Sequence, residues 1–259
     1  MNLVQDKIPE LLAMKNYPCK LFYDGNIELL KRVKVSIVGS RKPTMYSRLT
    51  IQKLSSSLSK HGVCIVSGGA MGIDATAHGA AGASNTIAVL PCGIDIRYPS
   101  VNKTLLNDIS KNGLLISQFD MGFIATPWSF VVRNELVVAL GDVLIVGEAE
   151  IDSGTMRSVE FALKMGKEIF VLPQRLGESS GTSQLLKELK AKPIYDIDEF
   201  VSGFATCSEP KIDKKEDDFF SFCAKNPTYD EACSKFPQRV FEAELGGEIK
   251  IANGRVWLL

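Results

Sequence analysis

Residues 36–47, SIVGSRKPTMYS, decide the fold of this chain because they pass from a strand into a helix through one short corner. The apolar, β-branched run at residues 33–38 predicts the strand, and helical spacing over residues 45–61 predicts the helix. Between them stands Gly39-Ser40-Arg41. Such a corner leaves backbone N–H groups at a helix N-terminus beside a guanidinium, which favours binding of an anion.

The same alternation of strand and helix continues to about residue 203. Apolar strand-like runs recur at residues 63–67, 86–90, 114–119, 142–146 and 168–172, with a short one at 194–195. Helical patterns lie between them at residues 75–81, 102–111, 131–140, 153–165 and 182–189. Strands buried on both faces and separated by helices indicate a parallel sheet. We therefore predict an α/β fold with an extended, Rossmann-like, doubly wound and mainly parallel sheet.

The domain organisation follows from changes in composition. Residues 1–32 are a short lead-in, residues 33–204 the Rossmann-like domain, and the charged, non-periodic residues 205–216 a linker. Residues 217–259 combine three short helical patterns with a hairpin signal at Asn253-Gly254. We predict a small winged-helix-like module there. Its exposed charges are mixed, so contact with protein and contact with DNA both stay open.

Charge is balanced overall but not locally. The 259 residues carry 30 basic and 30 acidic side chains, so no global field attracts nucleic acid or membrane. Residues 29–60 nevertheless contain eight basic residues and no acidic one, namely Lys31, Arg32, Lys34, Arg41, Lys42, Arg48, Lys53 and Lys60. This stretch predicts either a local basic face or the solvated side of the first helix.

Cysteine and histidine spacing gives no sign of a metal site. The six cysteines form no C-x-x-C pair, and the two histidines, His61 and His78, stand far apart in motif terms. We expect reduced thiols and no metal or cofactor. The N-terminus lacks a signal-peptide layout and no apolar run reaches about 18 residues, so we expect a cytoplasmic protein without a membrane partner.

Glycines and hydroxyl groups gather at the predicted carboxyl ends of the strands, where doubly wound sheets bind ligands. Lys42 follows the first corner, and the second strand ends in a glycine-rich turn, residues 67–72, whose candidate binding residues are Ser67, Gly68, Gly69 and Gly72. Glycine lets backbone N–H groups approach an anion closely. These clustered turns predict a phosphate-type ligand.

Three common ligand classes lack their signatures. A dinucleotide site needs G-x-G-x-x-G after the first strand, where this chain has GSRKPT with one glycine. No P-loop occurs, and Ser67 lacks the G-x-S-x-G setting of a hydrolase nucleophile. Asp74, His78 and Glu148 are interpreted as helix-start or turn residues rather than as acid–base catalysts.

A second distinctive stretch is TPWSFVVRNELVVALGDVLIV, residues 126–146. Trp128 and Phe130 are predicted in a loop, and Arg133 and Asn134 near the start of the helix that follows. Aromatic rings stack on bases and cations hold phosphates, so this stretch suits single-stranded nucleic acid. The alternative is that Trp128 and Phe130 only fill the core.

Several stretches together resemble the DNA processing protein A family, also called DprA or Smf. They are SIVGSRKPTMYS, VSGGAMGIDATAHGAA, AVLPCGIDIRYPSVN, FVVRNELVVALGDVLIV, DSGTMRSVEFALKMGK and IFVLPQRLGESSGTSQLL. The resemblance covers about residues 17–189 and extends weakly to the C-terminal module.

The resemblance implies a homodimer, formed through the Rossmann-like domain, that binds single-stranded DNA without sequence preference. It also implies that the protein protects incoming DNA and brings RecA recombinase onto it during natural transformation, and that it is not an enzyme. Family positions carry over to Arg41, to Gly68, Gly69 and Gly72, and to Phe130, Arg133 and Asn134. Some relatives have a lysine just before the aromatic loop, where this chain reads Ala125-Thr126-Pro127-Trp128.

An enzyme of the LOG type, a nucleoside-monophosphate phosphoribohydrolase, is the alternative. Its signature P-G-G-x-G-T-x-x-E places a catalytic glutamate three residues after the threonine. Here Ser158 stands at that position after Thr155, and Glu160 comes two residues late on another helix face.

Overall fold

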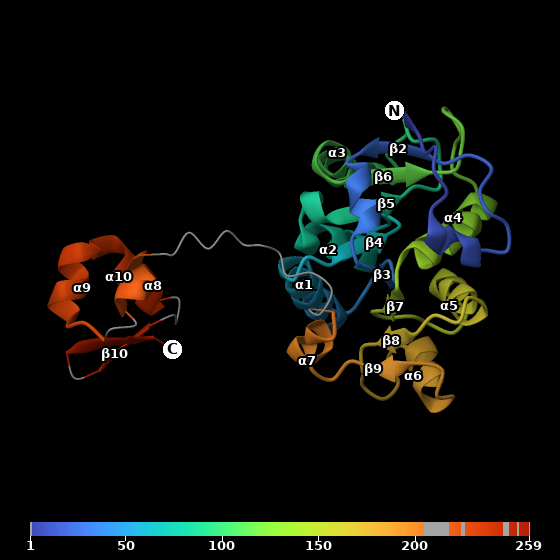
Figure 1. The fold of residues 1–259 in the computed structure, drawn as a ribbon. Helices are drawn as coiled ribbons and strands as arrows, with labels where there is room; N and C mark the ends of the chain where they lie inside the picture. Colours follow the sequence, from blue (N-terminus) through green and yellow to red (C-terminus); the bar gives the residue numbers. More distant parts are fainter. Residues whose placement is uncertain (1, 205–217, 224–225, 246–248, 253, 259) are drawn as a thin grey trace. The chain divides into compact units, whose positions relative to one another are not determined.

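The structure is a computed structural model that describes residues 2–204, 218–223, 226–245, 249–252 and 254–258. The chain divides into two compact units, Met1–Ser208 and Glu209–Leu259 (Figure 1). The predicted linker, residues 205–216, lies outside the described residues. No helix among the described residues is long and apolar enough to cross a membrane.

One sheet organises the first unit. Its strands lie in the order β1-β2-β6-β5-β4-β3-β7-β8-β9. Their bounds are β1 Asn2–Leu3, β2 Phe22–Gly25, β3 Lys34–Val38, β4 Cys64–Ser67, β5 Thr86–Val89, β6 Leu114–Ser117, β7 Val143–Val146, β8 Ile169–Val171 and β9 Lys192–Pro193. β3 to β9 pair with one another in parallel, whereas β1 pairs antiparallel with β2 and β2 antiparallel with β6. The predicted doubly wound, mainly parallel sheet is confirmed, and the lead-in adds β1 and β2 to its edge.

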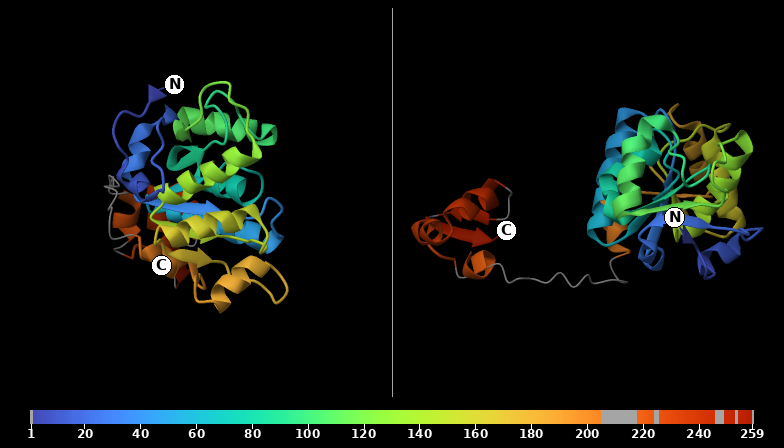
Figure 2. Two further views of the ribbon diagram at one scale, coloured as in Figure 1. Left: turned by 90° about the vertical axis from the view of Figure 1, so that its right-hand side faces the viewer. Right: turned by 90° about the horizontal axis from the view of Figure 1, so that it is seen from above.

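Helices cover both faces of this sheet (Figures 1 and 2). One face is covered by α1 (Met45–Lys60), α2 (Ile73–Ala81), α3 (Lys103–Asn112) and α7 (Ile197–Ser202), and the other by α4 (Pro127–Leu140), α5 (Gly154–Lys164) and α6 (Ser180–Lys187). Short 3-10 turns, η1 (Pro9–Ala13), η2 (Ile27–Lys31), η3 (Ala83–Asn85) and η4 (Ser100–Asn102), connect the elements. Successive strand residues therefore bury their side chains on opposite faces.

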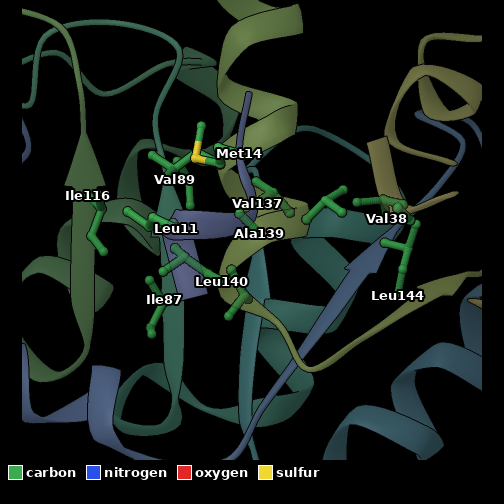
Figure 3. Close-up of a cluster of buried hydrophobic side chains, with 14 of the residues drawn as sticks. Leu11, Met14, Val38, Ile87, Val89, Ile116, Val137, Ala139, Leu140 and Leu144 are labelled. Carbon is green, nitrogen blue, oxygen red and sulfur yellow. The ribbon is translucent and has the colours of Figure 1, made fainter. Parts of the chain in front are cut away.

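The core beneath α4 fixes the position of that helix. Val137, Ala139 and Leu140 pack against strand residues such as Ile87 and Val89, and η1 closes the cluster with Leu11 (Figure 3). The last five residues of α4 are almost fully buried. The C-terminal half of α4 is thus packed against one face of the sheet. This packing holds the N-terminal turn of α4 at the carboxyl edge of the strands.

The start of α4 differs from the prediction. The helix begins at Pro127 rather than near residue 131, so Trp128 and Phe130 lie in its first turn and not in a loop. Thr126 accepts a hydrogen bond from the Ser129 amide at 3.3 Å, and the Ser129 hydroxyl accepts one from the Thr126 amide at 2.9 Å. A capping threonine followed by proline is a known helix start signal. The predicted start was too late because it was set by the apolar periodicity, which begins only at residue 131.

The second unit has three helices and a hairpin. They are α8 (Asp218–Cys223), α9 (Tyr229–Lys235), α10 (Pro237–Leu245), β10 (Ile249–Ala252) and β11 (Arg255–Leu258). The strands pair antiparallel with Ala252 opposite Arg255, and Gly254 in the turn has a positive φ of 70°. Asn253 lies outside the described residues. Seven buried residues, from Phe219 to Val256, give this unit a core of its own. That the module is a winged helix stays a prediction.

Candidate functional site at the switch point

A cavity lies where the strand order reverses. The chain runs from β3 to β4, β5 and β6 on one side, then returns to β7 and β8 on the other side of β3. Doubly wound sheets bind ligands outside the carboxyl ends of the strands at this point. The cavity there measures about 520 Å³ and is lined by residues from 38–41, 127–134 and 149–158, together with Ala70 and Asp74. We call it the switch-point cavity.

The Gly39-Ser40-Arg41 corner is held by its backbone. The Ser40 amide donates to the Glu148 carbonyl at 2.8 Å, and the Ser40 carbonyl accepts from the Ile73 amide at 3.1 Å. The Ser40 hydroxyl accepts from the Lys42 amide at 3.1 Å, and Thr44 caps α1. These bonds fix the corner from both sides, so Arg41 projects from a rigid support.

The Arg41 side chain is an exposed cation of this site. It is exposed, lines the cavity, and forms neither a hydrogen bond nor an ion pair with any described residue. Its guanidinium carbon lies 5.5 Å from the centre of the Phe130 ring. An exposed arginine over an aromatic face keeps its donors available for a phosphate.

The glycine-rich turn packs tightly against its own helix and against Arg133. The Asp74 carboxylate accepts hydrogen bonds from the amides of Gly68 at 3.2 Å and Ala70 at 3.3 Å, so these donors serve the protein itself. A Cβ on Gly68 would overlap the Arg133 guanidinium, and one on Gly72, where φ is 82°, would overlap the Ser40 carbonyl. These glycines thus permit close packing beside the cavity.

Arg133 lies at the base of the cavity rather than at its surface. The residue is 4% exposed, and its Nη1 donates to the carbonyls of Gly68 and of Val89, the latter at 3.0 Å. Burial raises the pKa of Asp74, and the charge of Arg133 partly offsets this effect. Burial likewise lowers the pKa of Arg133, and Asp74 opposes that shift. The pair supplies a fixed polar floor.

Aromatic residues stand beside Arg41. The rings of Phe130 and Tyr98 lie 5.7 Å apart, and both line a small cavity of about 30 Å³ together with Arg41 and Gly68. Sequence reasoning missed Tyr98, although it follows the end of β5 as the other candidate loops follow their strands. Trp128 is 62% exposed, packs 5.9 Å from Phe119, and lines neither of the two cavities.

The structure therefore separates the predicted site residues into two groups. Gly39, Ser40, Arg41, Phe130, Arg133 and Asn134 line the switch-point cavity, and Gly68 lines the small cavity beside it. Lys42, Ser67, Gly69, Gly72 and Trp128 line neither. The Ser67 hydroxyl is fully buried and donates to the Ile37 carbonyl at 2.6 Å, which is a structural role.

The basic stretch at residues 29–60 does not form one face. Lys31 pairs with Glu28 at 2.7 Å, Arg32 donates to Asn85, and buried Lys34 pairs with Glu10 at 2.6 Å. All three lie at the amino end of β3, the edge opposite Arg41. These cations lie at the start of β3 and the Gly39-Ser40-Arg41 corner follows its end. The length of the strand therefore separates them, although they are close in sequence.

The position at which the LOG signature has its glutamate faces the same cavity. Ser158 lines the cavity, whereas Glu160 is exposed and pairs with Arg157 at 3.0 Å. Glu160 therefore does not take the place of that glutamate. Among the described residues, no group of three or more His, Cys, Asp or Glu side chains is arranged to hold a metal ion.

His78 is a buried histidine on α2. It is fully buried, and its Nδ1 lies 2.6 Å from the Thr86 hydroxyl, which donates to the Ile65 carbonyl. Nε2 has no partner among the described residues. Burial, helped by the charge of Arg133, lowers the pKa of His78 to about 3.

The unfolded chain therefore binds a proton at His78 below about pH 6.5 while the folded chain does not. We expect His78 alone to lower the free energy of unfolding by about 2 kcal/mol between pH 7 and pH 5. Urea denaturation of wild type and His78→Gln at both pH values measures this difference. Equal pH dependence in the two proteins would contradict it.

The fold and the cavity define a doubly wound α/β protein with its candidate site at the switch point. The chain belongs to the DNA recombination-mediator protein A family, whose sequence profile matches residues 2–205. It is 35% identical to DNA processing protein DprA of Streptococcus pneumoniae over 192 residues, which are 72% of this chain and 68% of that protein. It is 30% identical to protein Smf of Escherichia coli over 246 residues, 93% of this chain and 64% of that protein.

Two solved structures agree with this assignment. DNA processing protein A from Helicobacter pylori, a protein described for its single-stranded DNA binding mode, superposes with a TM-score of 0.77 and 39% identity, over 78% of this chain and 94% of that one. DprA from Streptococcus pneumoniae superposes with a TM-score of 0.71 and 34% identity, over 76% and 71% of the two chains.

Proposed function

We propose that this protein binds single-stranded DNA at the switch-point cavity and acts as a recombination mediator on that strand. The observation that carries the proposal is Arg41, an exposed guanidinium held by a rigid corner over the Phe130 ring. Phosphate oxygens suit the guanidinium, and bases suit the adjacent aromatic rings. The related Helicobacter pylori protein, described as binding single-stranded DNA, supports the same substrate.

The proposal extends to what the family resemblance implies. The protein works in the cytoplasm as a homodimer formed through its Rossmann-like unit, protects DNA taken up during natural transformation, and loads RecA recombinase onto it. Faster assembly of RecA on single-stranded DNA in the presence of this protein is the expected readout, and an unchanged rate would remove this part of the proposal.

The test of substrate compares three ligands in one buffer: a single-stranded oligonucleotide, the duplex of the same sequence, and AMP. We expect the single strand to bind most tightly because its bases are free to stack. Equal affinity for the duplex, or an AMP affinity equal to that of the strand, would contradict the proposal.

The first unit is expected to bind single-stranded DNA without help from the second. The cavity is built entirely from residues of Met1–Ser208, and each unit has its own hydrophobic core. We expect the protein truncated after Ser208 to keep its affinity for single-stranded DNA within about threefold, a change below 1 kcal/mol. Fluorescence anisotropy with a labelled oligonucleotide measures this, and complete loss of binding would move the site to the second unit.

A further inference from the structure

The wall of the switch-point cavity contributed by α5 has a helix N-terminus without a protein cap. Ser153, Gly154 and Thr155 line the cavity, and the Ser153 side chain accepts no hydrogen bond from the first turn of α5. The Ser153 hydroxyl has no partner among the described residues. The N–H groups at the start of this helix, and the partial positive charge of its dipole, thus face the cavity.

Ser158 supplies an independent observation one turn further along α5. It is 1% exposed, lines the same cavity, and its hydroxyl forms no hydrogen bond with any described residue. A hydroxyl that lines a cavity without a protein partner is free to donate a hydrogen bond to a ligand. An oxygen of a ligand placed in the cavity would satisfy it.

The charges around this wall favour an anion. Arg157 also lines the cavity, and its contact with Glu160 joins two side chains that are 61% and 50% exposed, a kind of pair that holds little free energy. The Glu150 carboxylate accepts a hydrogen bond from the Ser180 amide at 3.4 Å and another from the Ser180 hydroxyl. The Glu150 carboxylate, which also lines the cavity, is therefore bound to α6, while Arg157 is held only weakly.

We propose that the α5 wall is a second phosphate subsite, which takes the phosphate next to the one bound by Arg41. One nucleotide then spans the cavity, whose volume of about 520 Å³ suits a group of that size. Asn134, which lines the cavity from α4 and makes no hydrogen bond to a described residue, faces the nucleoside between the two phosphates. This inference rests on the proposed binding of single-stranded DNA.

The first test removes the Ser158 hydroxyl. We expect Ser158→Ala to bind a single-stranded oligonucleotide about 15-fold more weakly, the loss of one hydrogen bond to a charged oxygen, and Ser158→Thr to bind as wild type does. Ser55 is the matched control because it is a fully buried helical serine, outside the cavity, with no hydrogen-bond partner in the part of the chain that the structure describes. Ser55→Ala should leave the affinity unchanged.

The second test identifies the phosphate. The ligand is a thymidine trinucleotide with two phosphodiesters, compared with forms in which one or the other is a neutral methylphosphonate. Wild type should lose affinity with either substitution, whereas Ser158→Ala should respond mainly to the linkage that Arg41 binds. Wild-type affinity of Ser158→Ala, or an equal response of that variant to both linkages, would overturn the second subsite while leaving the proposed function intact. If wild type binds no single-stranded DNA at all, the proposed function itself is wrong.

Discussion

Replacing Arg41 with alanine should weaken binding of single-stranded DNA by about 30-fold, which corresponds to roughly 2 kcal/mol for a charge-assisted hydrogen bond to phosphate. The side chain is exposed and bonds to no described residue, so its loss costs the folded protein little. Thermal denaturation should accordingly give the same midpoint for the variant and wild type. Anisotropy titrations with a labelled oligonucleotide measure the affinity.

The control for this variant is Arg48→Ala. Arg48 lies on α1, is exposed, and lines neither of the two cavities. The Arg48→Ala substitution therefore removes the same formal charge from a position outside the candidate site. We expect a change of less than about twofold, since salt screens the charge of an exposed side chain that lies outside both cavities. Equal losses in both variants would show that the protein attracts DNA through its general charge and that the corner has no special role.

Arg133→Met should produce the largest loss of stability. Arg133 is buried, donates to two backbone carbonyls, and lies close enough to Asp74 to affect the pKa of that carboxyl group. Without the guanidinium, the two backbone carbonyls lose their hydrogen-bond donor and the buried Asp74 carboxylate loses the nearby positive charge. We expect the free energy of unfolding to fall by about 3 kcal/mol or more.

Urea denaturation at pH 7 measures this effect. Arg41→Met is the matched control, because it makes the same substitution on the exposed arginine of the same cavity and should change the free energy of unfolding by less than about 0.5 kcal/mol. Equal midpoints for Arg133→Met and Arg41→Met would contradict the structural role of Arg133.

The sheet was predictable because its signals are local. Each parallel strand is a short apolar run followed by a turn and a helical pattern, as in residues 36–47, and this information lies within a few residues. The antiparallel strand β2 was not predicted, since residues 22–25 carry no comparable run and join the sheet by pairing with distant β6. Strand order likewise depends on contacts between distant segments.

The site was predictable in part for the same reason. Arg41 follows a strand end directly, so its place at the carboxyl edge could be inferred from sequence. The bond between Arg133 and the Gly68 carbonyl joins residues 65 positions apart, and no pattern near either residue indicates it. Trp128 was predicted in a loop, but it lies in the first turn of α4, where its ring packs against that of Phe119.

The most direct test of the central proposal is the salt dependence of single-stranded DNA binding by wild type and Arg41→Ala. If about three to five phosphates are neutralised, the logarithm of the association constant should fall with the logarithm of salt concentration at a slope of about −2 to −3.5. Loss of the Arg41 contact should make that slope shallower by about 0.7. A flat dependence for wild type, or identical slopes for the two proteins, would contradict a phosphate contact by Arg41.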